Sequence, residues 1–184
     1  MHSEIKLGRG DSGKMNSINN LTKLFGVLIL LILAISLIGC IAPTQNENKF
    51  KTIEGNSICK LDGKPIIRMY STSICPHCIW VGPTFNSVVQ KYVDENKIVA
   101  YHWEWIINNE GNVTGTKDKL TSAMQQTLPA GEEAVFKEFS PSTGVPAFIF
   151  GCKYYRIGNQ FELKKDLNAE KAEFTRIIEE LLKE

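Results

Sequence analysis

The sequence Cys75-Pro76-His77-Cys78 lies between a short apolar run and a stretch with helical periodicity, and this arrangement constrains the fold strongly. The run Pro65–Tyr70 predicts a buried strand, and the stretch from Pro76 to about Asp94 predicts a helix. The apolar stripe of that helix consists of Val81, Phe85, Val88, Val89 and Tyr92. Pro76 suits the first helical position, where no backbone N–H is needed. The two cysteines therefore stand one helical turn apart at a helix start.

This position gives the two cysteines a specific chemistry. Backbone N–H groups and the helix dipole stabilise a thiolate at Cys75, and a protonated His77 adds positive charge beside it. A more stable thiolate makes Cys75 a better leaving group and its disulfide more oxidising. The alternatives are a zinc site, for which the chain has no second cysteine pair of this spacing, and a structural disulfide, which stabilises little over so short a loop. We therefore interpret Cys75 and Cys78, with Pro76 and His77, as a redox centre that needs no metal and no dissociable cofactor.

The remaining pattern predicts a strand at Ile98–Ile107, then helices at Lys117–Gln126 and Glu132–Phe139. Strands at Ala147–Phe150 and Lys153–Ile157 follow around a tight turn, and a last helix starts near Asn168 as its N-cap, with Glu170 in the first turn. A parallel pair with a crossover helix, followed by a hairpin and a helix, predicts a mixed sheet covered on both faces.

In its cysteine motif and its order of elements, the chain resembles the thioredoxin superfamily over roughly Lys64 to Leu182. The resemblance rests further on Pro83, on Gly144-Val145-Pro146 before a strand, and on Ile157-Gly158 after the following strand. It implies an α/β, thioredoxin-like fold with a mixed central sheet flanked by helices. The segment Asn109–Ser142 then forms a modest helical insert before the cis-proline strand, for which we favour a structural role.

The resemblance also implies roles for single residues. Pro146 is expected to follow a cis peptide bond, which leaves the backbone of Val145 as an edge where an extended substrate segment pairs. The Pro-His dipeptide and Val145 resemble DsbA-type oxidases more than thioredoxin, which favours an oxidase over a reductase. Met69 stands where the superfamily usually has a buried acid, so the proton acceptor for Cys78 is unassigned; Glu104, or His102 on the same strand, is a possible substitute.

Cys59 and Cys152 are the two cysteines outside the motif and the N-terminal segment. In a thioredoxin-like sheet both fall at the pole away from the redox centre, and an exported location permits a structural disulfide between them. Two buried free thiols are the alternative.

The N-terminal part has a different character. Leu24–Ala42 is apolar apart from Ser36, which fits either a spanning helix or a signal peptide, and the positive charges before it predict that the chain after Ala42 is exported. Leu37-Ile38-Gly39-Cys40 resembles a lipoprotein lipobox, which implies a lipid anchor on Cys40; an uncleaved signal-anchor is the alternative. We expect residues 1–42 to be the cytosolic start and the signal or anchor, residues 43–56 a tether, and residues 57–184 the thioredoxin-like domain.

These features together predict a membrane-tethered thiol–disulfide oxidoreductase at the outer face of the cell membrane. Its expected partners are cysteine-containing exported proteins, a membrane redox partner for regeneration, and the membrane itself. The 21 Lys and Arg residues nearly balance the 20 Asp and Glu residues, so nucleic acid is not an expected partner. The competing hypothesis is a non-catalytic peptide- or metal-binding lipoprotein with the same fold.

Overall fold

The structure, a computed structural model, describes residues 48–55 and 57–184. The predictions for residues 1–42, Cys40 included, lie outside the described residues, as do residues 43–47 and 56 of the expected tether. Among the described residues, no helix is long and apolar enough to cross a membrane.

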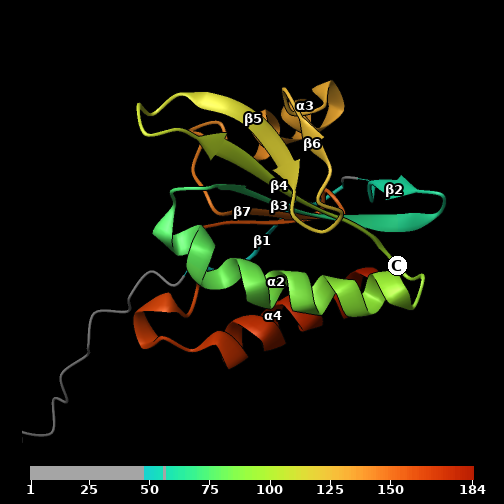
Figure 1. The fold of residues 1–184 in the computed structure, drawn as a ribbon. Helices are drawn as coiled ribbons and strands as arrows, with labels where there is room; N and C mark the ends of the chain where they lie inside the picture. The colour runs from blue at the N-terminus through green and yellow to red at the C-terminus, as the bar shows by residue number, and fades with distance from the viewer. Residues whose placement is uncertain (1–47, 56) are drawn as a thin grey trace, which may run out of the picture. The chain divides into compact units, whose positions relative to one another are not determined.

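The described residues form a mixed sheet with helices on both faces, as the sequence predicts (Figure 1). The strand order is β1-β8-β7-β3-β4-β5-β6, and β2 pairs with β3 outside this path. Only β3 and β4 pair in parallel among these neighbours, and all the others are antiparallel. The strands are β1 (Lys51–Thr52), β2 (Lys60–Leu61), β3 (Lys64–Thr72), β4 (Val99–Ile107), β5 (Val113–Asp118), β6 (Met124–Gln125), β7 (Ala147–Phe150) and β8 (Tyr154–Ile157).

Helices α2 (Pro76–Asp94) and α4 (Leu167–Leu181) cover one face of the sheet, and α3 (Ala130–Phe139) covers the other (Figure 1). The predicted stripe of α2 is buried, together with Cys78 and Gly82. Strand β3 is the centre of the fold because its side chains alternate between two cores. Met69 packs in the core under α2 and α4, whereas Tyr70 packs in the core under α3.

The start of the folded part and the start of α4 both differ from the prediction. Phe50, within the range expected to be a tether, packs against Phe148, Phe150 and Phe174, and β1 after it pairs with β8. The N-cap of α4 is Asp166 and not Asn168, because the Asp166 carboxylate accepts the N–H of Ala169 at 2.9 Å. The folded part therefore begins before residue 57.

The predicted helix at Lys117–Gln126 is wrong. Strand β5 runs to Asp118, and a turn leads into β6, so the segment is a β-hairpin added to the edge of β4. The turn is held by the buried Asp118 carboxylate, which accepts the backbone N–H groups of His102 and Leu120 and the hydroxyl of Thr121. Pairing with β4 overrides the local helical pattern because each residue of β5 gains sheet hydrogen bonds there.

The expected helical insert at Asn109–Ser142 therefore consists of a β-hairpin followed by a single helix. It contains the β5–β6 hairpin and then α3, which begins at Ala130, two residues before the predicted start. Phe136 and Phe139 on α3 are buried against the sheet. The hairpin of the insert thus extends the sheet, and α3 covers the sheet face opposite α2.

Candidate redox site

Cys75 is the N-cap of α2, and Pro76 occupies the first helical position. The Cys75 sulfur accepts the backbone N–H of Cys78 at 3.1 Å, and the Cys75 N–H is donated to the carbonyl of Thr72 at the end of β3. The sulfur therefore takes one of the unpaired N–H groups that every helix start leaves. This local geometry follows from a strand that ends directly before a helix.

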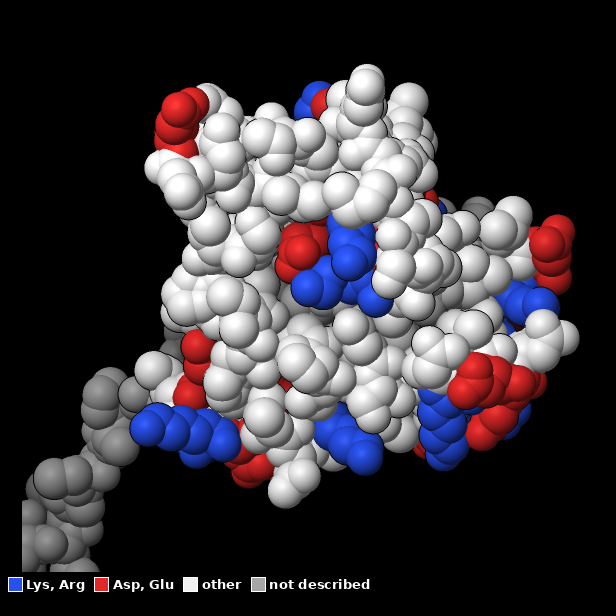
Figure 2. All heavy atoms as spheres, in the orientation of Figure 1, with Lys and Arg blue, Asp and Glu red and all other residues white. Residues whose placement is uncertain are grey.

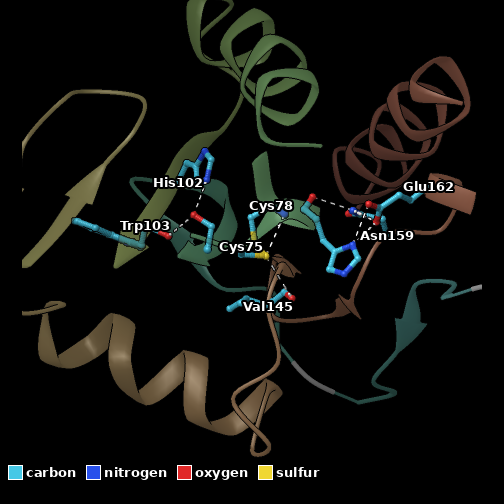
Figure 3. Close-up of a disulfide and its surroundings, with 9 residues drawn as sticks. Cys75, Cys78, His102, Trp103, Val145, Asn159 and Glu162 are labelled. Carbon is cyan, nitrogen blue, oxygen red and sulfur yellow. Dashed lines mark hydrogen bonds and ion pairs between the residues drawn. A yellow bond between two sulfur atoms is a disulfide. The ribbon is translucent and has the colours of Figure 1, made fainter. Parts of the chain in front are cut away.

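The two sulfurs form a disulfide and differ in their surroundings (Figure 3). Cys78 is buried in the core under α2, with an exposed fraction of only 4%, whereas Cys75 is half-buried at the edge of that core. An external thiol consequently has better access to Cys75. Ile74 and Ile79, which flank the pair, are both exposed.

The Val145–Pro146 peptide bond is cis, and β7 begins at the next residue. The carbonyl oxygen of Val145 lies 4.0 Å from the Cys75 sulfur. The structure thus places the Cys75–Cys78 pair next to the Val145–Pro146 segment, although Cys75 and Val145 are 70 residues apart in the chain.

His77 is exposed, and its side chain contacts a short 3-10 turn, η1 (Glu162–Lys164), which lies before α4. Its Nδ1 lies 2.8 Å from the Glu162 carboxylate. The Asn159 amide donates both to the carbonyl of His77, at 2.9 Å, and to Glu162, at 2.8 Å. Sequence reasoning missed both residues, because they lie more than 80 positions away in a segment without a motif.

Beneath α2, His102 occupies the space beside Met69. Its Nδ1 lies 2.6 Å from the amide oxygen of Asn86 and its Nε2 lies 3.0 Å from the hydroxyl of Ser71. A Cβ on Gly82 would lie 3.2 Å from the His102 ring, so a glycine lets the helix approach this closely. Burial, with a smaller contribution from Lys119, lowers the pKa of His102 to about 3, so the imidazole is neutral near pH 7.

The carboxylate of Glu104, the other possible proton acceptor, forms an ion pair with Lys119 at 3.2 Å. Glu104 stands opposite Ser71 in the parallel pair of β3 and β4. Its role as acceptor for Cys78 stays a prediction.

A partly buried acid that the sequence did not single out lies on the opposite face of the sheet. The Glu132 carboxylate of α3 accepts hydrogen bonds from Arg68, Tyr70 and Trp103 at 2.8 to 3.2 Å. Burial and the negative charge of Glu132 raise the pKa of Tyr70 far above its usual value. The network joins α3 to the centre of the sheet through charge-assisted hydrogen bonds.

Cys59 and Cys152 form the second disulfide, which is the pairing hypothesised from the sequence. The bond lies at the start of β3, since the Cys59 carbonyl accepts the N–H of Ile66, whereas the Cys75–Cys78 pair follows the end of that strand. Arg68 directs Nη1 toward the Cys152 sulfur at 3.9 Å. The two disulfides therefore stand at opposite ends of the same strand.

An apolar groove opens beside Val145. Its volume is about 310 Å³, and it is lined by Thr72, Trp105, Ile107, Val113, Phe136, Thr143 and Val145. The side chains come from β3, β4, β5, α3 and the loop before β7, so the insert supplies part of the walls. Figure 2 shows mostly uncharged side chains on the face over β5 and β6.

Within residues 48–55 and 57–184, no group of three or more His, Cys, Asp or Glu side chains is arranged to hold a metal ion. Comparison with known proteins finds no matching family model, no matching curated protein and no matching solved structure.

Proposed function

We propose that the protein is a thiol–disulfide oxidoreductase with a thioredoxin-like fold. The observation that carries the proposal is the disulfide at the start of α2, in which the half-buried Cys75 sulfur accepts a helix N–H while Cys78 is buried. This asymmetry supplies an accessible sulfur with a stabilised thiolate and a protected resolving cysteine. The strand order and the Val145–Pro146 segment beside Cys75 support the thioredoxin-like assignment.

In the direction we favour, a substrate thiolate attacks the Cys75 sulfur, the Cys75–Cys78 bond breaks, and its electron pair leaves on Cys78 as a thiolate. A second substrate thiolate then attacks the substrate sulfur of the mixed disulfide, and Cys75 leaves as a thiolate. The substrate dithiol is oxidised by two electrons to a disulfide, and the protein disulfide is reduced to two thiols. An extended substrate segment pairs with the backbone of Val145 during the exchange.

The proposal includes the setting of the reaction. Cys40 as a lipid anchor, or the apolar segment as a transmembrane helix, holds the domain at the outer face of the membrane. The Cys59–Cys152 disulfide supports an oxidising compartment, because structural disulfides persist outside the cytosol. Cysteine-containing exported proteins are the substrates, and a membrane redox partner restores the Cys75–Cys78 disulfide.

The experiment uses the full chain in detergent and a reduced, unfolded protein with several cysteines as substrate. We expect disulfide formation in the substrate and complete loss of it in C75S. When C78S is mixed instead with the oxidised form of the same substrate, the Cys75 thiolate should open a substrate disulfide and a mixed disulfide should accumulate, because no second cysteine resolves it. The matched control is C59S/C152S, which removes the other disulfide and should keep the exchange. Failure of the oxidised wild type to exchange with any dithiol would favour the non-catalytic binding protein.

The reduction potential of the Cys75–Cys78 couple separates the two directions. A value near about −120 mV supports an oxidase, and a value near about −270 mV supports a reductase. The measurement is the equilibrium of the full chain with defined glutathione ratios.

A further inference from the structure

The loop before α4 contacts the redox motif through Glu162 and Asn159 (Figure 3). A carboxylate only accepts hydrogen bonds, so Nδ1 of His77 carries a proton and donates it to Glu162 at 2.8 Å. The remaining nitrogen, Nε2, is then the basic position of the neutral ring. Glu162 thus selects one tautomer of His77.

The same loop also holds the His77 backbone. The Asn159 amide donates one hydrogen bond to the His77 carbonyl and another to Glu162, so one side chain joins the first turn of α2 to the carboxylate. The His77 ring is 60% exposed, and an exposed side chain without such contacts is free to change rotamer. The contacts hold the ring beside the start of α2.

A buried ion pair positions the loop. Glu170 accepts the backbone N–H groups of Gln160 and Phe161 at 2.6 and 2.8 Å, and it pairs with Arg156 at 2.7 Å. Neither side chain of this pair is exposed to solvent. The two backbone bonds fall between Asn159 and Glu162, so the buried carboxylate fixes the stretch that carries both residues.

We propose that Glu162 is a positioning residue of the redox centre: it orients His77 and stabilises the imidazolium that accompanies the Cys75 thiolate. This inference rests on the proposed function. When the mixed disulfide with the substrate is resolved, Cys75 is released as a thiolate. His77, two residues further along the chain, already has its Nδ1–H held by a carboxylate. A proton on Nε2 then completes an imidazolium that is held by the carboxylate and lies on the same first turn of α2 as the Cys75 thiolate. The arrangement follows the general logic of a cysteine, a histidine and an orienting acid.

The negative charge of Glu162 alone would act in the opposite direction, because a second anion near Cys75 disfavours the thiolate. The two effects have opposite signs and are separable by removing the histidine. With His77 present, the cation dominates because the Glu162 carboxylate is paired with it at 2.8 Å, so the charge of the carboxylate is largely balanced. With His77 removed, only the repulsion from the carboxylate remains.

The experiment measures the glutathione equilibrium and the pH dependence of thiolate absorbance in the full chain in detergent, for the wild type, E162Q, N159A, H77A and H77A/E162Q. The E162Q substitution keeps the size of the side chain but removes the anion. Exposed ion pairs typically contribute up to about 1 kcal/mol, so we expect the reduced form to lose about threefold to fivefold in stability relative to the disulfide. The thiolate should form at a higher pH in E162Q, and N159A should shift both measurements in the same direction.

The control is E133Q, which breaks an exposed ion pair with Lys137 on α3 and should leave both measurements unchanged. In the H77A background, E162Q should have no effect or the opposite sign. Unchanged values in both E162Q and N159A, or an equal shift with and without His77, would overturn the inference. If the wild type itself does not exchange with glutathione, the proposed function fails instead, so the two failures are distinguishable.

Discussion

The guanidinium of Arg156 and the carboxylate of Glu170 lie 2.7 Å apart with no exposure to solvent, and the carboxylate accepts two backbone N–H groups of the loop that contacts His77. Three aromatic rings surround the guanidinium at 4.7 to 5.1 Å, those of Phe50, Phe148 and Phe174. Burial lowers the pKa of Arg156, and the partner charge of Glu170 opposes that shift. The pair thus links the core under α2 and α4 to the loop that contacts His77.

Breaking this ion pair from one side should be severe. In R156M the Glu170 carboxylate stays buried without its cation, and we expect a loss of about 3 to 5 kcal/mol in the free energy of unfolding. The double variant R156M/E170Q removes the charge that R156M leaves unpaired, and it should be more stable than R156M. Urea denaturation followed by circular dichroism measures both, and equal stability of the two variants would contradict this expectation.

The buried His102 should make the protein less stable in acid. The pKa of His102 is about 3 in the folded protein and has the ordinary value of 6.5 in the unfolded chain. At a pH between 3 and 6.5, the unfolded chain therefore binds a proton at His102 that the folded protein does not bind. The contribution of His102 to stability is therefore complete above pH 6.5 and is lost as the pH falls from 6.5 toward 3.

Replacing His102 by glutamine removes this proton linkage. Between pH 4 and 6, the free energy of unfolding should depend less steeply on pH in the variant than in the wild type. The slope should decrease by about 1.4 kcal/mol per pH unit, which corresponds to one proton. The measurement is a set of urea titrations across that range. A comparable change in H77Q, whose ring is exposed, would point to a general effect and not to burial.

The Cys59–Cys152 disulfide should contribute stability without taking part in exchange. It closes a loop with a sequence separation of 93, for which chain entropy predicts about 4 to 5 kcal/mol. The variant C59A/C152A should therefore unfold at lower urea concentration while its Cys75–Cys78 couple keeps the wild-type glutathione equilibrium. A changed equilibrium would mean that the two disulfides communicate along β3.

The groove beside Val145 should select substrates by an apolar side chain near their cysteine. Trp105 and Phe136 form two of its walls, and burial of one large apolar side chain contributes about 1.5 to 3 kcal/mol. In W105A we expect kcat/KM to fall at least about tenfold for cysteine peptides with a neighbouring Leu or Phe, and to stay constant for glutathione.

M124A is the matched control for this prediction, because Met124 is 61% exposed on β6 and outside the groove. Equal losses for apolar peptides and for glutathione in W105A would show that the substitution acts on the redox centre itself. Exchange assays under single-turnover conditions separate these outcomes.

The helical insert illustrates where local pattern is insufficient. Lys117–Gln126 has helical spacing, but the edge of β4 is unpaired until β5 binds it, and Asp118 satisfies the backbone groups of the turn. The same limit applies to Glu132. Nothing in its neighbourhood distinguishes it from Glu133, and only the packing of α3 on the sheet places it against Arg68, Tyr70 and Trp103.

The sequence by itself determined the start of α2, because a strand, an N-cap cysteine, a proline at the first helical position and an apolar stripe are all local signals. Its resemblance to the thioredoxin superfamily also implied a cis bond at Val145–Pro146 and left a Cys59–Cys152 disulfide and two free thiols as alternatives, of which the structure has the disulfide. Tertiary structure alone decided that Glu162 and Asn159 contact His77 and that His102 lies beneath Gly82. Those contacts join residues that are far apart in the chain. Strand register places His102 beneath α2, and the buried Arg156–Glu170 pair positions the loop that contacts His77. Neither arrangement is encoded by a local sequence pattern.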